Sequence, residues 1–462
     1  MTIWPPKSED LRRPAYKSLA DTLVRAVDAG ELRNGDRLPT HRNLAYDLGL
    51  SVQTVSRAYD ELIRRGVIAG EVGRGTFVRA GRSDTKTPFV PDSQNGEFID
   101  FSILMPVFEA VHLNEMQRAL KKLGADLPPS TVSAFRPSTA LRNYSGAAAN
   151  WLTRCGLNPS EQGLLMTNGN TSAMTIALMT VANAGDLIVT EELGHHTLKA
   201  LSRYLGIRIQ GLEIDAEGIV PAAFAAACKK SSVKAIYLMP TGLNPRAATM
   251  SVERREALVS VARQYDVLII ENDAWGPIQP GRPDPIASIA PERTFYFTSL
   301  TKCIMPGLRF GFLSMPEAFE SAAANRHLVT NWMATPLMAE IGCRWIEDGT
   351  AERLLEWQMK ALGERNKLAV EILADIPFYS SENGMHIWLP MPGSWSEEAF
   401  VAHARLNRVA IAPGSAFDMS GTARNQGVRI CLGAETVQTL ERGLAVISRL
   451  ARSNPEPALL TL

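Results

Sequence analysis

The stretch TSLTKCIMPGLRFGFL, residues 298–313, places Lys302 after a group of hydroxyl residues and ahead of Arg309. The aromatic run FYF precedes the stretch and predicts a strand that ends near Ser299. A Pro-Gly turn separates the lysine from the arginine, and no carboxylate adjoins the lysine. A lone lysine is most often a solvated surface charge. Whether Lys302 has a functional role therefore depends on which other residues lie near it in the fold.

Short apolar runs recur on both sides of this stretch and alternate with amphipathic, helix-like segments. The runs are GLLMTN, DLIVTEE, VKAIYLMP, DVLIIEND, RTFYFTS and LRFGFLSM. This rhythm predicts an α/β domain with a buried, mainly parallel sheet between helices on both faces. Ligands of such sheets bind beyond the carboxyl ends of the strands, so the residues directly after each run are the candidates for a site.

Polar residues follow four of these runs. The set comprises Asn170, Thr171, Asn244, Asp273, Ser299, Lys302 and Arg309. The segment GNTS, residues 169–172, opens an apolar helix whose free N–H groups predict an anion site. The sequence therefore predicts an anion site, an amide, a carboxylate, a lysine and an arginine at one edge of the sheet.

Pyridoxal 5'-phosphate requires such a set of groups. Lys302 would form a Schiff base with its aldehyde, which explains a buried lysine without an acidic partner. Asp273 would keep the pyridine nitrogen protonated. Thr171, Ser299 and Arg309 would hold the phosphate, and the amide of Asn244 would donate to the ring oxygen.

From about residue 98 to its end, the chain resembles the fold-type I aminotransferases. The markers are NPR in place of the family's NPTG, END before AW, SLTK as the lysine box, PGLRFG, and VRICLGA. The resemblance implies a small C-terminal subdomain, a site at a dimer interface, and Arg429 as the residue that binds an effector's α-carboxylate. It also implies His195 as the ring-stacking residue.

Three positions depart from the family's pattern. Trp275 replaces a tyrosine that bonds the ring oxygen, and Phe135 replaces a tyrosine that reaches the phosphate from the other subunit. His195 replaces the usual aromatic residue. These changes predict that pyridoxal phosphate still binds, with Trp275 and His195 lining its site, and that turnover is weak or absent.

The N-terminal residues 1–80 show a different order of elements. PAYKSLADTLVRAVDAG predicts a helix that ends at Gly30, THRNLAYDLGL a short helix that ends at Gly49, and SVQTVSRAYDELIRRG a helix capped by Ser51. VIAGEVGRGTFV predicts a two-stranded ribbon that turns at residues 73–75. The predicted inward side chains are Leu19, Leu23, Val24, Val27, Val55, Ala58, Tyr59, Leu62 and Ile63. This order is typical of a winged helix-turn-helix.

Polar side chains at the start of the third helix predict contacts with DNA. Ser51, Gln53, Thr54 and Arg57 would face the major groove, and Arg42 and Arg74 would reach phosphates or, for Arg74, the minor groove. Residues 1–80 contain 13 Lys or Arg against 10 Asp or Glu, so charge alone does not distinguish this domain from a helical dimerisation module. The segment resembles the GntR-type winged helix, and the whole chain resembles the MocR-type regulators of that family.

Composition limits the remaining possibilities. The 48 Lys and Arg balance the 48 Asp and Glu, and the five scattered cysteines predict reduced thiols in a cytoplasm. No signal peptide or membrane-spanning run is predicted, and the pair His195–His196 lacks the spacing of a metal site. Residues 81–97, rich in polar residues, predict a linker between the domains at 1–80 and 98–462.

Two functions compete on these observations. The first is a homodimeric regulator that binds operator DNA and senses an amino acid or amine through pyridoxal phosphate. The second is an active aminotransferase with an appended DNA-binding domain. A third, a vestigial sensor without cofactor, is disfavoured by the retained set of Lys302, Asp273 and Arg309.

Overall fold

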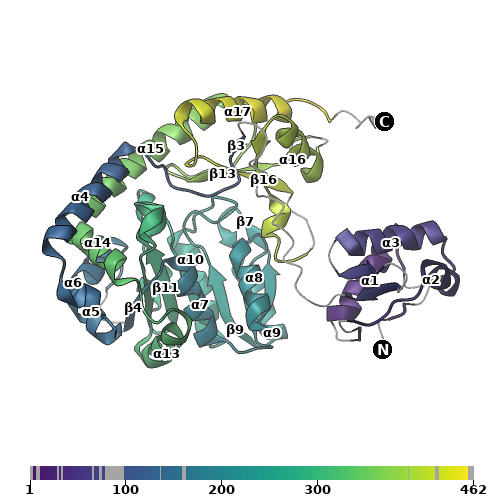
Figure 1. Cartoon of the computed structure of the whole chain (residues 1–462), viewed down its shortest axis with the longest axis horizontal. Helices are drawn as coiled ribbons and strands as arrows, with labels where there is room; N and C mark the ends of the chain where they lie inside the picture. The colour runs from purple at the N-terminus through teal and green to yellow at the C-terminus, as the bar shows by residue number, and fades with distance from the viewer. Residues whose placement is uncertain are drawn as a thin grey trace. The chain divides into compact units, whose positions relative to one another are not determined.

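The computed structural model describes residues 4–6, 11–28, 31–32, 35–64, 67–71, 75–78, 98–135, 137–158, 163–393, 395–421 and 426–455. Two compact units, residues 1–90 and 91–462, make up the chain (Figure 1). The predicted linker at 81–97 lies outside the described residues.

The first unit contains three helices and a two-stranded ribbon. These are α1 (Ala15–Asp28), α2 (His41–Leu48), α3 (Val52–Arg64), β1 (Ile68–Glu71) and β2 (Gly75–Val78), the strands being antiparallel. Thr40 caps α2 by accepting a hydrogen bond from the Asn43 N–H, and α2 ends at Gly49, whose φ of 62° is left-handed. Ser51 caps α3 through the Thr54 N–H at 3.1 Å. These helix boundaries confirm the predicted end at Gly49 and the predicted cap at Ser51.

The core of this unit contains most of the side chains that were predicted to point inward. Leu19, Leu23, Val55, Ala58, Tyr59 and Leu62 are buried, and Val24 and Val27 pack against them. The prediction for Ile63 was wrong, because its side chain is 47% exposed. It follows Leu62 on the helix and so turns away from the core side. Gly30 and most of the predicted turn at 73–75 lie outside the described residues.

A seven-stranded sheet organises the second unit, in the order β4-β12-β11-β10-β9-β5-β6. Its strands are β4 (Gly163–Thr167), β5 (Leu187–Glu191), β6 (Arg208–Leu212), β9 (Val233–Leu238), β10 (Leu268–Asn272), β11 (Thr294–Ser299) and β12 (Gly311–Met315). All neighbours are parallel except β12, which runs antiparallel to β4 and β11. The sheet confirms the predicted α/β fold, with the edge strand β6 added.

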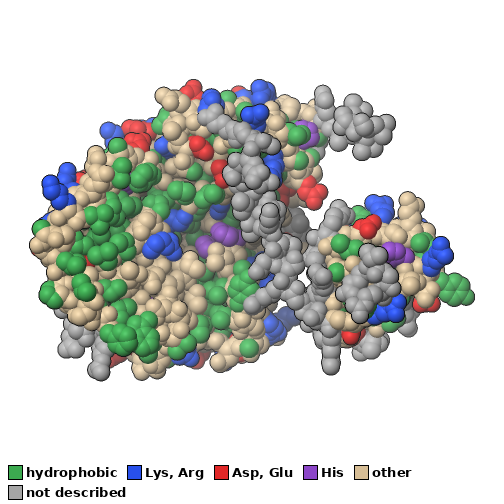
Figure 2. Space-filling view, in the orientation of Figure 1, with side chains coloured by type: hydrophobic (Ala, Val, Ile, Leu, Met, Phe, Trp, Pro, Cys, Tyr) green, Lys and Arg blue, Asp and Glu red, His purple; other side chains and the backbone are tan. Residues whose placement is uncertain are grey.

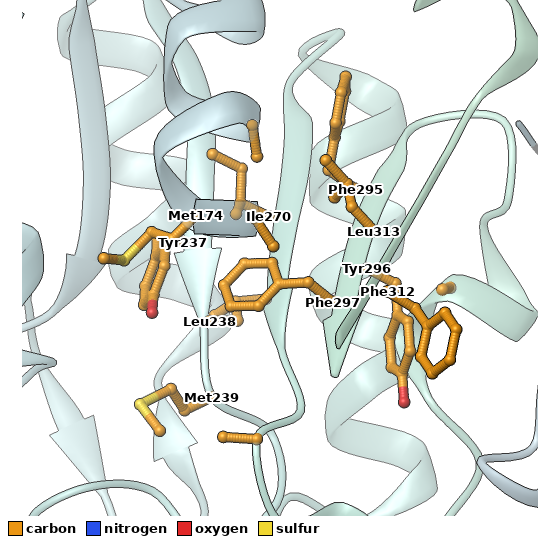
Figure 3. Packing of buried hydrophobic residues seen from close by; sticks show 14 of the residues in the cluster. Met174, Tyr237, Leu238, Met239, Ile270, Phe295, Tyr296, Phe297, Phe312 and Leu313 are labelled. Atoms are coloured by element: carbon orange, nitrogen blue, oxygen red, sulfur yellow. The ribbon is translucent and has the colours of Figure 1, made fainter. Parts of the chain in front are cut away.

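Helices cover both faces of this sheet (Figure 1). The helices of this part of the unit are α4 (Ala110–Asp126), α5 (Pro129–Ser133), α6 (Pro137–Arg154), α7 (Asn170–Val181), α8 (His196–Leu205), α9 (Pro221–Lys230), α10 (Val252–Gln264), α11 (Ile286–Ile289), α12 (Leu300–Cys303), α13 (Glu320–Asn331) and α14 (Pro336–Glu347). The short hairpin β7 (Ile214–Asp215) and β8 (Gly218–Ile219) lies outside the sheet. Figure 3 shows the buried aromatic and aliphatic side chains at the centre of the sheet.

A smaller C-terminal layer has a core of its own. It consists of the antiparallel strands β13 (His386–Pro390), β16 (Gly427–Cys431) and β15 (Ala412–Pro413), with α15 (Thr350–Ile372), α16 (Glu397–Leu406) and α17 (Val437–Ala451). The strand β3 (Ile99–Asp100) pairs with β14 (Val409–Ala410) and ties the start of this unit to the layer. Among the described residues, no helix is long and apolar enough to cross a membrane.

Candidate functional site

Two glycines let three segments converge at the carboxyl end of β11. Gly169, the residue before α7, has φ of 77°, and a Cβ there would lie 3.2 Å from Arg309 Nη2 and 3.3 Å from Thr301 Oγ1. A Cβ on Gly311 would lie 2.8 Å from the Ser299 Cβ. The start of α7 therefore lies against Arg309 and the hydroxyl of Thr301, which adjoins Lys302.

Several hydroxyls in this place are buried without a hydrogen-bond partner. Among the described residues they include Ser172 Oγ in the first turn of α7, and Ser299 Oγ and Thr301 Oγ1 beside Lys302. Unpaired buried polar atoms are rare in proteins, and hydroxyls beside a guanidinium and a helix N-terminus suit a phosphate group. Thr171 is exposed, so Ser172 and Thr301, rather than Thr171, supply buried hydroxyls here.

Lys302 lies on α12, and its Nζ donates a hydrogen bond to the Leu104 carbonyl. Burial lowers the pKa of Lys302 to about 8, and the positive charges of Arg429 and Arg309 act in the same direction. A lysine with a lowered pKa holds a larger fraction of neutral amine near neutral pH, which is the form that attacks a carbonyl carbon. The surroundings of Lys302 therefore favour the neutral amine that its predicted role requires.

Arg429, on β16, reaches the same site from the C-terminal layer. Its Nη1 donates to Asn244 Oδ1 at 3.0 Å, its Nη2 donates to the Ser102 carbonyl at 2.6 Å, and its guanidinium lies 4.8 Å from the Phe417 ring centroid. Its Nε is buried without a partner. Because the Asn244 carbonyl oxygen is turned toward Arg429, its amide nitrogen is left to donate elsewhere.

His195 directly precedes α8 and stacks on His196, with ring centroids 5.0 Å apart. Burial lowers the pKa of His195 well below its usual value, and the charges of His196, Lys302 and Arg429 add to this. A neutral imidazole ring close to Lys302 and Arg429 is compatible with the predicted ring-stacking role.

The structure corrects the prediction for Asp273. Its carboxylate accepts hydrogen bonds from Arg282 Nη1 at 2.8 Å and from the Tyr296 hydroxyl at 2.6 Å. Tyr296 is in register with Glu271, the second-last residue of β10, and side chains alternate between the faces of a strand. Asp273 therefore lies on the Tyr296 face of the sheet, opposite to the side chain of Asn272.

Asn272 is the side chain of β10 that turns toward the start of α7. Its Oδ1 accepts a hydrogen bond from Asn170 Nδ2 at 3.4 Å, and its Nδ2 donates to the Tyr237 hydroxyl at 2.7 Å. Figure 3 shows the hydroxyls of Tyr237 and Tyr296 well apart, with Phe297 between them. The carboxylate predicted for the pyridine nitrogen is thus absent from the face of the sheet that carries Asn272. The amide of Asn272 occupies the end of β10 on that face.

Trp275, predicted to line the cofactor site, is buried with its indole N–H bound to the backbone. Its indole Nε1 donates to the carbonyls of Thr241 at 3.1 Å and Gly242 at 3.0 Å. A Cβ on Gly242 would lie 2.5 Å from that nitrogen, so the glycine is required for the close approach. The donor of Trp275 is therefore used by the backbone and does not serve the ring oxygen.

The predicted DNA-binding residues lie on α2 and α3 of the first unit. Gln53, Arg57 and Arg42 are exposed, and the Arg57 guanidinium lies 4.4 Å from the Tyr16 ring centroid. Ser51 Oγ and Thr54 Oγ1 are 2.8 Å apart and share the helix cap. Arg74 lies outside the described residues.

Two family models match this chain. Residues 15–78 match "Bacterial regulatory proteins, gntR family", and residues 109–447 match "Aminotransferase class I and II". Similar proteins along the whole length include the HTH-type transcriptional regulator YdeF of Bacillus subtilis, 26% identical over 97% of this chain and 96% of YdeF. The HTH-type transcriptional regulator TauR of Rhodobacter capsulatus is 24% identical over 94% of this chain and 96% of TauR.

Solved structures share the fold of the second unit. An archaeal alanine:glyoxylate aminotransferase has a TM-score of 0.72 and 21% identity, over 77% of this chain and 91% of that one. The Pyrococcus horikoshii kynurenine aminotransferase also has a TM-score of 0.72, with 19% identity over the same shares. The chain belongs to the aminotransferase class I and II family and carries a gntR-family domain at its N-terminus, as in a MocR-type transcriptional regulator.

Proposed function

We propose that this regulator binds pyridoxal 5'-phosphate and senses an amino acid or amine that reacts at the same site. The observation that carries the proposal is the convergence of Arg309 and the unpartnered Thr301 hydroxyl at Gly169, beside Lys302. Two further unpartnered buried hydroxyls lie on the same segments, Ser299 just before Lys302 and Ser172 in the first turn of α7. When bound, the cofactor supplies an aldehyde that condenses reversibly with primary amines. A site of this chemistry recognises amine ligands.

Each side chain has a distinct task in this proposal. Arg309 and the buried hydroxyls hold the phosphate, Lys302 holds the aldehyde carbon, and the free amide N–H of Asn244 donates to the ring oxygen. The neutral ring of His195 covers one face of the cofactor. Arg429 binds the carboxylate of an amino-acid effector, which would replace its present bonds to Asn244 and Ser102.

The proposed working form is a homodimer in the cytoplasm, where it has access to operator DNA. A large set of apolar side chains is exposed on α4, α5, α13 and the segments beside them: Ile103, Phe108, Leu113, Leu120, Val132, Phe135, Val329 and Trp332. Figure 2 shows hydrophobic side chains over this part of the larger unit. Exposed apolar surface of this kind marks interaction sites. A two-fold dimer would present two winged helices to the two half-sites of an operator.

The test couples DNA binding to ligand binding. The full chain is used to select a bound duplex from a random-sequence pool, and fluorescence anisotropy then measures its affinity with pyridoxal phosphate and each of a panel of amino acids and amines. An effector that changes DNA affinity by roughly 5–150-fold, the range of typical allosteric couplings, supports the proposal. Rapid release of keto acid from such an effector, with unchanged DNA affinity, would instead establish an aminotransferase.

A further inference from the structure

We infer that the cofactor's pyridine nitrogen faces the neutral amide of Asn272 and is held unprotonated, so that the site binds amines without activating them strongly. The inference rests on the proposed binding of pyridoxal phosphate. It concerns a different property, namely the protonation of the ring once the cofactor is bound.

The position of Asn272 follows from the strand that carries it. β10 lies beside β11 in the sheet, and β11 leads into Lys302. The Asn272 amide also contacts Asn170, the first residue of α7, whose preceding residue Gly169 adjoins Arg309. Asn272 is therefore a polar side chain at the end of β10 on the face where the lysine, the arginine and the hydroxyls converge.

The buried carboxylates around this edge are already engaged elsewhere. Asp273 is bound by Arg282 and Tyr296 on the other face. Glu271 accepts bonds from the N–H groups of Ile286 and Ala287 at the start of α11. No carboxylate on β10 is therefore left for the pyridine nitrogen.

On β5, Glu191 accepts bonds from the Met239 N–H and the Thr190 hydroxyl. Burial raises the pKa of Glu191 to about 7, so its negative charge is not fixed near neutral pH. Among the described residues, the charged side chains that act on Lys302 are the cations Arg309 and Arg429.

These surroundings decide the charge of the ring nitrogen. A carboxylate within about 4–6 Å shifts the pKa of a cationic group by about 1–3 units in favour of the charged form. An amide has no net charge and supplies no such stabilisation, while nearby cations oppose it. The second N–H of Asn272 Nδ2, beyond the one given to Tyr237, can donate to an unprotonated nitrogen.

The functional consequence separates binding from catalysis. An unprotonated pyridine ring withdraws electrons less strongly, so it stabilises poorly the negative charge that develops when an amino acid loses its α-proton. Condensation of an amine with the aldehyde does not need that stabilisation. The site would thus hold an amine effector for long periods without consuming it, which suits a sensor.

The test reads the ring nitrogen directly. The full chain is loaded with pyridoxal phosphate labelled with ¹⁵N in the ring, and the ¹⁵N chemical shift is followed from pH 6 to pH 9 on the scale set by free cofactor. The wild-type protein is expected to show the shift of an unprotonated nitrogen throughout. N272D is expected to show a protonated nitrogen at neutral pH, with its titration moved upward by about 1–3 units, and a faster loss of α-deuterium from an amino-acid effector.

The control exploits the carboxylate on the other face. D273N should leave the nitrogen shift unchanged, and the double variant D273N/R282Q removes the buried pair without leaving an isolated charge if the single variant folds poorly. A protonated ring nitrogen in the wild-type protein would overturn the inference while leaving cofactor binding intact. If that proton were lost in D273N or in D273N/R282Q, Asp273 would be its partner in place of Asn272. Failure of the wild-type protein to bind the cofactor would overturn the proposed function and this inference together.

Discussion

The lowered pKa of Lys302 predicts how fast the apoprotein captures pyridoxal phosphate at different pH values. Only the neutral amine attacks the aldehyde, and with a pKa of about 8 its fraction is roughly one tenth at pH 7. A lysine at its ordinary pKa of about 10.4 would hold only about 0.04% neutral amine at that pH. The structure thus predicts a neutral-amine population that is larger by a factor on the order of 200.

The assay follows the growth of the visible absorption band after apoprotein is mixed with excess pyridoxal phosphate, from pH 6 to pH 10. The observed rate should rise with pH through a midpoint near pH 8 and level off above about pH 9, because roughly nine tenths of the amine is neutral one unit above its pKa. Arg309→Gln removes a cation that lowers the pKa of Lys302, so its midpoint should move to higher pH. Lys302→Ala should show no band that borohydride can fix. A wild-type rate that still rises steeply above pH 9.5 would refute the argument that burial activates this lysine.

Three further predictions concern the rest of the chain. Asp273→Asn should lower the free energy of unfolding by about 3–5 kcal/mol in urea titrations, because it leaves a buried guanidinium uncompensated; a change below 1 kcal/mol would contradict the buried pair. Arg42→Ala should reduce the salt dependence of DNA affinity by about one unit of slope, whereas Gln53→Ala should cost about 1–3 kcal/mol at one base position; identical effects of both on all duplexes would refute base reading by Gln53. Val132→Glu should dissociate the dimer in sedimentation at micromolar concentration, and Leu406→Glu, equally exposed on α16, should not; a dimer that tolerates both would place the interface elsewhere.

The positions of most strands were predictable because each strand depends mainly on its own local sequence. Runs such as VKAIYLMP and RTFYFTS are apolar on both faces of a strand, as expected for strands covered on both sides. They form β9 and β11 in the parallel part of the sheet. The caps at Thr40 and Ser51 and the stop at Gly49 likewise follow from local hydrogen bonding and backbone conformation. β6 was missed because its alternation, RIQGL, is only half apolar, as is usual for an edge strand.

The side chains of the site were less predictable, because a strand reverses its face at every residue. Asn272 and Asp273 are neighbours in the sequence, yet one turns to the α7 face and the other to the opposite face. An error of one position therefore exchanges a charged group for a neutral one. The spacing from Asn272 to Trp275 gives no local sign of which residue faces the ligand. The bonds that fix the two side chains come from Tyr237 and Tyr296, which are 35 and 23 residues away along the chain, and from Arg282, which is nine residues away.

Thr301 illustrates a second limit. A hydroxyl beside Lys302 reads in the sequence as part of the lysine box, and nothing local shows that it approaches Gly169, more than a hundred residues earlier. That contact exists because β12 pairs with both β11 and β4, and because Gly311 and Gly169 have no side chains to hold the backbones apart. Binding groups that depend on such approaches become visible only in the folded chain.

The same geometry explains why loss of catalysis need not entail loss of binding. The groups proposed to hold the phosphate and the aldehyde, Arg309, Thr301 and Lys302, lie on the segments after β11, whereas the group that would activate the ring ends β10. A substitution at Asn272 therefore changes the electronics of the ring without removing a contact to the phosphate. Asp273, the carboxylate next to it, is held in the fold by Arg282 and is not available to compensate. If the proposed inference holds, the DNA-bound state would be set by how tightly an amine binds, because slow chemistry would leave the bound effector in place.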